Sequence, residues 1–176
     1  MNTLVIDASI AVKWVVEEEG TLEALALRRQ AELIAPELLV AECANILWKK
    51  VQRNELSTDE AFLGARLLQA AEIELLPTRS LLEPATRIAV ELDHPAYDCL
   101  YLALAFERDC RFVTADERFL RKLAEGNRSR FRDKVIALTR NGRPPGRANA
   151  EGKTVSIIRE RGAMSGKAKT SRSKSP

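Results

Sequence analysis

Short apolar runs alternate with longer segments of helical periodicity along the first 138 residues of the chain. Residues 3–7 are apolar on both faces until they reach Asp7, which is typical of a buried parallel strand. Strand-like runs also lie at residues 73–76, 111–114 and 134–138, and a further short apolar run lies at 33–35. The pattern therefore predicts a sheet made of short strands.

Segments with helical spacing of apolar residues separate these runs: 9–16, 22–30, 37–53, 58–72, 80–92, 96–108 and 117–125. Pro36 suits the first position of the third segment, and Ser57 with Glu60 matches a capping box that opens the fourth. Short strands that alternate with helices predict an α/β fold, here a three-layer α/β/α sandwich with a short-stranded central parallel sheet.

The composition divides the chain into a body and a tail. The 176 residues, 45% of them hydrophobic, suffice for one compact domain, which we assign to residues 1–140. Residues 141–176 are rich in Gly, Pro, Ser, Lys and Arg, so we expect a disordered C-terminal tail. An arm that attracts RNA or docks a partner is the alternative for this tail.

Charge is distributed unevenly between these two parts. The tail holds nine basic and two acidic residues, net +7, and the remaining 19 basic and 23 acidic residues leave the body at net −4. The body therefore lacks the overall positive charge of a nucleic-acid-binding domain. Any affinity for RNA must come from metal ions, local patches or the tail.

Several classes of protein are excluded by what the sequence lacks. No run approaches the roughly 18 apolar residues of a membrane helix, and Asp7 and Lys13 interrupt the first apolar segment. We expect a cytoplasmic protein with no membrane contact. Three distant cysteines and a single histidine, His94, disfavour a disulfide framework, a Cys-rich zinc site and a multi-histidine metal site. A catalytic base is conceivable for His94, beside Pro95, but we interpret this lone histidine as structural or exposed.

Four acidic residues lie where an acid is unusual. Asp7 and Asp116 each end a predicted strand, although capping of the following helix would explain either one alone. Glu42 lies on the apolar stripe of its helix, with Asn45 one turn further along. Asp98 opens a segment that is apolar nearly all round, where an unpaired carboxylate is costly unless it caps the helix, is protonated or meets a cation.

These four acids can converge at the carboxyl edge of one parallel sheet. Four carboxylates in one place repel each other, and divalent cations or protons relieve that repulsion. Oxygen ligands without nearby Cys or His favour Mg²⁺, with Mn²⁺ as a second candidate. A metal ion held by few carboxylates keeps bound water that can attack a phosphodiester. The constellation predicts a metal-dependent nuclease.

The residues around the four acids resemble a known family. The segments Val5-Ile-Asp7-Ala-Ser9, Pro36-Glu-Leu-Leu-Val-Ala-Glu42-Cys-Ala-Asn45, Ala96-Tyr-Asp98-Cys-Leu-Tyr101-Leu-Ala-Leu-Ala105 and Phe112-Val-Thr114-Ala-Asp116 are similar to the motifs of the PIN domain, specifically of VapC-type toxins of prokaryotic toxin–antitoxin pairs. The similarity covers residues 2–138 in the expected order. The basic tail is a departure from the pattern of these toxins.

The resemblance implies a Mg²⁺-dependent endoribonuclease with Asp7, Glu42, Asp98 and Asp116 as its acidic site. Asp7, Asp98 and Asp116 would be the metal ligands. Three polar residues would orient the acids or a metal-bound water: Ser9, Asn45 and Thr114. The resemblance further implies a homodimer, a cognate antitoxin protein, an RNA substrate, and products with a 5′-phosphate and a 3′-hydroxyl.

Two other functions are compatible with parts of the pattern. A strand-end aspartate also introduces phosphatases of the haloacid-dehalogenase type, but these need a second acid two positions later, where this chain has Ser9. The other alternative is a PIN-like body that binds RNA or protein without nuclease activity. Metal-dependent RNA cleavage separates the nuclease from this binding module.

Overall fold

The computed structural model describes residues 2–125 and 128–138, so the predicted tail lies outside the described residues. Five strands form one sheet in the order β3-β2-β1-β4-β5, and every neighbouring pair is parallel. The strands are β1 (Asn2–Ile6), β2 (Ala31–Pro36), β3 (Glu74–Leu76), β4 (Arg111–Thr114) and β5 (Val135–Ala137). The prediction of a short-stranded parallel sheet is therefore confirmed.

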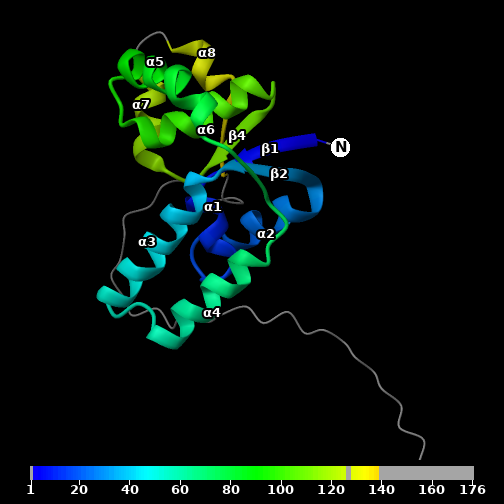
Figure 1. Ribbon diagram of the computed structural model, residues 1–176, viewed down its shortest axis with the longest axis vertical. Helices are drawn as coiled ribbons and strands as arrows, with labels where there is room; N and C mark the ends of the chain where they lie inside the picture. Colours follow the sequence, from blue (N-terminus) through cyan, green and yellow to red (C-terminus); the bar gives the residue numbers. More distant parts are fainter. Residues whose placement is uncertain (1, 126–127, 139–176) are drawn as a thin grey trace, which may run out of the picture.

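Helices cover both faces of this sheet, which confirms the three-layer α/β/α architecture. Figure 1 shows helices α1 to α4 on one side of the strands and α5 to α8 on the other. The first group comprises α1 (Ala8–Ala11), a 3-10 turn η1 (Val12–Trp14), α2 (Thr21–Gln30), α3 (Leu38–Gln52) and α4 (Thr58–Gln69). The second comprises η2 (Arg79–Leu81), α5 (Leu82–Leu92), α6 (Ala96–Glu107), α7 (Glu117–Ala124) and α8 (Ser129–Arg132).

The strand order explains why the helices divide in this way. The chain proceeds from β1 outward to β2 and β3, and then returns to add β4 and β5 on the other side of β1. Since crossovers between parallel strands are right-handed, this reversal sends the later helices to the opposite face. The reversal also creates a switch point between β1 and β4 at the carboxyl edge, where open parallel sheets place their ligand sites.

The core is built around β1 and α6, as their apolar sequences predict. Val5 and Ile6 of β1 are fully buried, and α6 buries six of its twelve residues against β1, β2 and β4. No helix among residues 2–125 and 128–138 is long and apolar enough to cross a membrane.

Several predicted boundaries differ from the structure. The segment 9–16 forms only one α-helical turn before it tightens into η1, where the Trp14 indole N–H donates to the Ala24 carbonyl at 2.9 Å. The β-branched residues of this segment, Val12 among them, have low helix propensity, which favours the early end. The short helix α8 was not predicted, because its four residues are too few to show periodicity.

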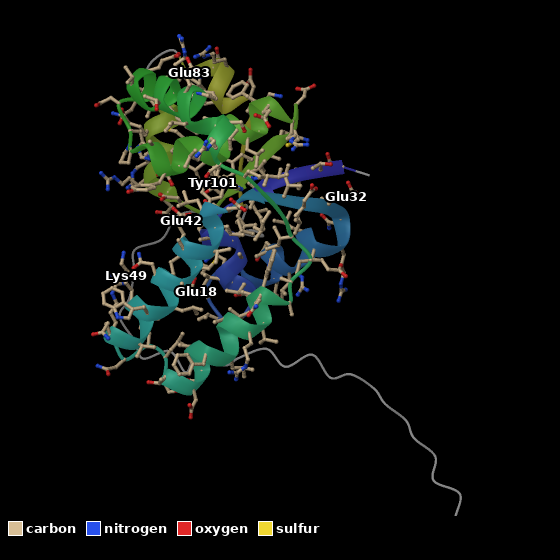
Figure 2. The ribbon with its side chains drawn as sticks, in the orientation of Figure 1. Glu18, Glu32, Glu42, Lys49, Glu83 and Tyr101 are labelled. Carbon is tan, nitrogen blue, oxygen red and sulfur yellow. The ribbon has the colours of Figure 1, made fainter. Side chains whose placement is uncertain are left out.

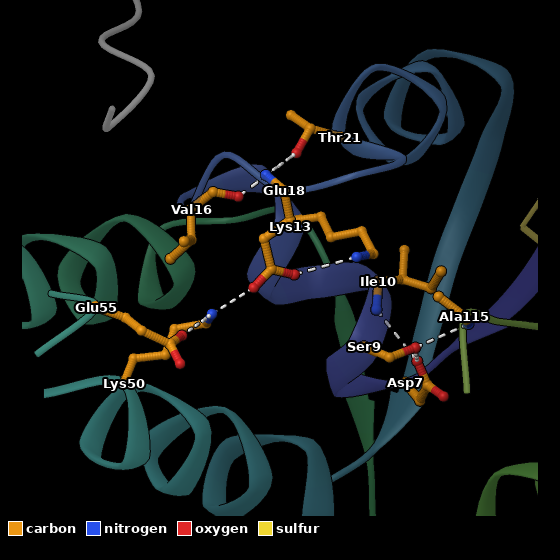
Figure 3. Close-up of polar contacts among 10 residues, drawn as sticks. All are labelled: Asp7, Ser9, Ile10, Lys13, Val16, Glu18, Thr21, Lys50, Glu55 and Ala115. Atoms are coloured by element: carbon orange, nitrogen blue, oxygen red, sulfur yellow. Dashed lines mark hydrogen bonds and ion pairs between the residues drawn. The ribbon is translucent and has the colours of Figure 1, made fainter. Parts of the chain in front are cut away.

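A charge cluster ties the end of the first helical segment to α3 (Figure 3). Glu18 forms ion pairs with Lys13, at 3.1 Å, and with Lys50, and Lys50 also contacts Glu55 at 3.0 Å. Burial alone would raise the pKa of Glu18, but the hydrogen bond from Lys50 and the charges of Lys50 and Lys13 outweigh it, so its pKa is lowered. The cluster thus stabilises the ionised form of Glu18 in the fold.

We expect Lys50→Met to lower the free energy of unfolding by about 1–2 kcal/mol, between the values for exposed and buried ion pairs. The loss should shrink as the pH falls through the range in which Glu18 protonates, because the neutral carboxyl no longer needs the ammonium group. Urea unfolding at pH 7 and pH 3.5 measures both effects. Lys49→Met, at the exposed neighbouring position, is the control and should change stability by less than about 0.5 kcal/mol. Equal losses in both variants would contradict this account.

Candidate active site

Asp7 lies directly after β1, at the switch point of the sheet. The strand register pairs Ile6 with Val113, which places Asp7 beside Thr114 across 107 residues of sequence. Its Oδ1 accepts hydrogen bonds from the Ser9 hydroxyl and from the Ile10 backbone N–H at 3.2 Å, and its Oδ2 accepts from the Thr114 hydroxyl. Figure 3 shows that Ser9 also accepts from the Ala115 N–H, at 2.9 Å, and so ties Asp7 to the loop after β4.

Asp7 is almost completely buried, with 5% of its surface exposed. Burial raises its pKa to about 7, although the hydrogen bonds from Ser9, Thr114 and Ile10 act in the opposite direction. The negative charge of Asp98 raises it further. The fold therefore opposes ionisation of Asp7 unless positive charge is supplied.

Glu42 reaches the site from α3. Its Oε2 accepts a hydrogen bond from the hydroxyl of Tyr101 on α6, so that side chains from the two helical layers meet at the sheet edge (Figure 2). Tyr101 is fully buried, and its ring stacks on Phe112 of β4 at a centroid distance of 5.6 Å. Burial raises the pKa of Glu42, the Tyr101 hydrogen bond partly offsets this, and the charge of Asp98 adds to the increase.

Asp98 lies in the first turn of α6 and is held from the preceding junction. The His94 Nε2 lies 2.7 Å from the Asp98 Oδ2. Burial raises the pKa of Asp98, and the charge of Asp116 adds to this increase, whereas the hydrogen bond from His94 and the charge of Arg118 lower it; the net result is a raised pKa.

Asp116 caps α7. Its Oδ1 accepts from the backbone N–H groups of Arg118 and Phe119, at 2.7 and 3.0 Å, and its own N–H donates to the Thr114 hydroxyl at 3.0 Å. The capping role considered from the sequence is thus present. The same hydroxyl bonds Asp7, so one threonine connects two of the four acids.

The structure brings the four predicted acids into one electrostatic neighbourhood, which we call the acidic edge: Asp7, Glu42, Asp98 and Asp116. The negative charge of Asp98 raises the pKa values of Asp7 and Glu42, and the negative charge of Asp116 raises the pKa of Asp98. Ser9 and Thr114, two of the three residues predicted to orient the acids, contact Asp7. Asn45 is exposed on α3, and no hydrogen bond links it to these acids within the described part of the chain.

Three of the four carboxylates in the acidic edge share one hydrogen-bonding pattern. In Glu42, Asp98 and Asp116 one carboxylate oxygen accepts hydrogen bonds, and the other accepts none among the described residues. Over residues 2–125 and 128–138, no three Asp, Glu, His or Cys side chains are grouped closely enough to enclose a metal ion as they stand. The donor set nevertheless fits a hard divalent cation, because it consists of oxygens, several of them open, in a field that disfavours their own ionisation.

A hollow of about 850 Å³ lies elsewhere, between α2, β2 and the end of α4. Its lining includes Leu25, Leu33 and Leu68 but none of the four acids. The acidic edge is the better candidate for the chemistry than this hollow, because burial raises the pKa values of its carboxylates Asp7, Glu42 and Asp98.

Two residues that touch the site were not selected from the sequence. Tyr101 lies in a continuous apolar run and resembles a core residue, and its contact with Glu42 spans 59 positions. The sequence favours a structural or exposed role for His94, yet the residue touches Asp98. Its spacing of four from Asp98 was the available signal, but Pro95 between them made a shared helical face improbable from sequence.

Comparison with known proteins identifies the family. The model of the PIN domain matches residues 4–125 of the chain. The chain belongs to the PIN-domain family. A solved structure, that of PAE2754 from Pyrobaculum aerophilum, covers 78% of this chain and 90% of its own with a TM-score of 0.56 at 21% sequence identity. This likeness supports the fold of this PIN-domain protein.

Individual relatives of known type place the chain more specifically within the PIN-domain family. Ribonuclease VapC3 of Pyrobaculum aerophilum is 31% identical over 130 residues, 68% of this chain and 93% of the relative. The VapC ribonuclease Mb0985 of Mycobacterium bovis and ribonuclease VapC9 of Mycobacterium tuberculosis are each 30% identical over 115 residues, 65% of this chain and 87% of the relative. This PIN-domain protein is thus of the VapC ribonuclease type, which confirms the resemblance noted in the sequence.

The raised pKa of Asp7 predicts that the metal-free protein loses stability as the pH rises. An unfolded aspartate ionises near pH 3.9, whereas folded Asp7 ionises near pH 7, so between these values the folded state binds more protons and the stability falls by about 2–3 kcal/mol between pH 5 and pH 8. Asp7→Asn should flatten this slope and be more stable than wild type at pH 8. Urea unfolding in EDTA at both pH values measures it.

The matched control is Asp93→Asn, because the Asp93 side chain is exposed and should leave the slope unchanged. If Asp7→Asn keeps the wild-type slope, Asp7 ionises normally in the folded protein and this interpretation of its burial is wrong.

Proposed function

We propose that this PIN-domain protein is a Mg²⁺-dependent endoribonuclease and the toxin of a type II toxin–antitoxin pair. The observation that carries the proposal is the acidic edge, in which burial and mutual repulsion raise the pKa values of Asp7, Glu42 and Asp98. The charge of Arg118 lowers the pKa of Asp98 but does not offset the increase, and a divalent cation would supply the further positive charge that these carboxylates need. Membership of the VapC ribonuclease type supports RNA as the substrate.

The residues of the acidic edge would have different roles in catalysis. Asp7, Asp98 and Asp116 would hold the metal, and Ser9 and Thr114 keep Asp7 in one orientation. Bound Mg²⁺, or Mn²⁺ in its place, would activate a water for attack on the phosphodiester and stabilise the charge that develops there. Glu42 keeps its Oε1 without a partner among the described residues while Tyr101 holds its Oε2. With a raised pKa, Oε1 suits acceptance of a proton from the attacking water.

The proposal includes partners and products. Hydrolysis by an attacking water would leave a 5′-phosphate and a 3′-hydroxyl on the RNA. A cognate antitoxin would block the acidic edge until it is degraded. We place the protein in the cytoplasm, where its RNA substrate is found.

A homodimer is also part of the proposal. On α3, Val40 and Trp48 are 58% and 57% exposed, and they lie with Ala44 on one helical face at a spacing of four. Apolar side chains exposed in a row favour burial against another molecule.

The nuclease proposal predicts that Asp98→Asn folds like wild type and loses RNA cleavage. The amide removes one negative charge from the acidic edge, so the metal-free variant should be at least as stable as wild type. The experiment incubates purified protein with total prokaryotic RNA in Mg²⁺ and in EDTA, and sequences the new 5′ ends. We expect discrete cuts from wild type in Mg²⁺, none in EDTA, and at least a 100-fold loss in the variant.

Asp93→Asn is the matched control, since it lies five residues away with an exposed side chain and should cut at the wild-type rate. Intact RNA in every lane, from folded protein freed of antitoxin, would favour the alternative of a PIN-like binding module. A sharp fall in the melting temperature of Asp98→Asn would instead assign Asp98 a structural role.

For the homodimer, we expect light scattering to give wild-type protein twice the 19.6 kDa mass of one chain. Trp48→Glu places a charge in the exposed apolar row of α3 and should shift the mass toward that of one chain. Phe62→Glu, also exposed but on α4, is the control. An unchanged mass in Trp48→Glu would place the interface elsewhere.

A further inference from the structure

His94 is held in the junction between α5 and α6 by both its backbone and its side chain. Asp93 caps the C-terminus of α5 in the left-handed region, at φ 49°, and Pro95 is the N-cap residue of α6. His94 therefore lies between two helices, and its backbone N–H donates to the Ala89 carbonyl at 3.1 Å. Its side chain is only 5% exposed. The imidazole ring packs against the buried ring of Phe119 at a centroid distance of 5.1 Å.

In the orientation that these contacts support, the imidazole Nε2 meets Asp98. The acceptor is Oδ2, at 2.7 Å, and Oδ1 accepts no hydrogen bond among the described residues. Phe119, on which the ring rests, also donates its N–H to Asp116. The position of His94 is therefore set by the same turn of α7 that holds a second acid of the acidic edge.

We propose that His94 is a positioning residue for the cation site: it holds Oδ2 of Asp98 so that only Oδ1 is presented to the cation, which favours Mg²⁺ over Ca²⁺. The inference rests on the proposed function, because it assumes that Asp98 is a metal ligand. It adds to that function a residue that determines which cation the site prefers.

The chemistry of the two cations explains the expected preference. Mg²⁺ requires a nearly ideal octahedron at about 2.0–2.1 Å and takes few carboxylates, one oxygen each. Ca²⁺ is larger, tolerates irregular geometry and readily takes both oxygens of a carboxylate. With Oδ2 occupied by His94, Asp98 suits the first pattern. Without His94, the carboxylate can rotate and offer both oxygens.

Cation binding, independent of cleavage, tests this inference. Electron paramagnetic resonance follows Mn²⁺ binding to the full-length, metal-free protein, with Mg²⁺ and Ca²⁺ as competitors. In His94→Leu we expect Mg²⁺ affinity to fall by about 10- to 100-fold, the usual effect of removing the hydrogen-bond partner of a metal ligand. Ca²⁺ affinity should fall less, so the Mg²⁺ to Ca²⁺ preference decreases.

Two further variants separate positioning from general disruption. His94→Gln places an amide N–H near the position of Nε2 and should restore most of the Mg²⁺ affinity, whereas His94→Asn is too short to reach Oδ2 and should behave like His94→Leu. Asp93→Asn, next to His94 but directed to Lys122 and not to Asp98, should bind like wild type. Melting temperatures identify variants that fail to fold, and the Gln and Asn pair remains informative if Leu is not tolerated.

The outcomes distinguish this inference from the proposed function. If wild type binds cations and His94→Leu or His94→Asn binds them equally well with the same preference, His94 has no positioning role and the nuclease proposal still stands. The inference is also overturned if Gln and Asn weaken binding alike. If wild type binds no divalent cation, the proposed metal-dependent function fails, and this inference fails with it.

Discussion

Burial of the Asp7 carboxylate at the end of the central strand is the constraint on which the rest of the site depends. A carboxylate with 5% exposure is costly unless it accepts hydrogen bonds, and the fold provides three donors. The donors are the Ile10 backbone N–H and the Ser9 hydroxyl, both in α1, and the Thr114 hydroxyl on the neighbouring strand. The register of β1 and β4 places the Thr114 hydroxyl beside Asp7. The pairing of these two strands therefore provides one of the hydrogen bonds that stabilise the buried Asp7 carboxylate.

The strand order then determines which other side chains can join Asp7. Reversal of the chain at β1 places α3 in one helical layer and α6 in the other, so Glu42 and Asp98 approach the same sheet edge from opposite sides. The Tyr101 hydroxyl on α6 bonds Glu42 on α3, and Tyr101 itself rests on Phe112 of β4. These contacts connect the two helical layers at the point where the acids meet.

The sequence predicted those parts of the structure that depend on neighbours along the chain. The apolar run that ends at Asp7 indicated a buried strand, and the apolar surroundings of Asp98 indicated a buried helix, and both are observed. Partners that depend on tertiary packing could not be predicted. Tyr101 looks like any core aromatic until Glu42 is brought to it across 59 residues, and His94 reaches Asp98 only because the chain turns at Asp93 and Pro95. Asn45 illustrates the converse, since helical spacing alone placed it with Glu42, whereas packing leaves it exposed.

The same arrangement implies that the acidic edge is maintained at the expense of stability. Burial and mutual repulsion raise the pKa values of Asp7, Glu42 and Asp98, so each ionised carboxylate opposes folding near neutral pH. Ser9, Thr114, Tyr101 and His94 reduce this cost but do not remove it, since the three pKa values stay raised despite their hydrogen bonds. Both oxygens of Asp7 accept hydrogen bonds, whereas Glu42 and Asp98 each keep one oxygen that accepts none among the described residues. Under the proposed function, a divalent cation would supply the interactions that the protein leaves unmade at these carboxylates, so the acidic edge would contribute to binding more than to the stability of the fold.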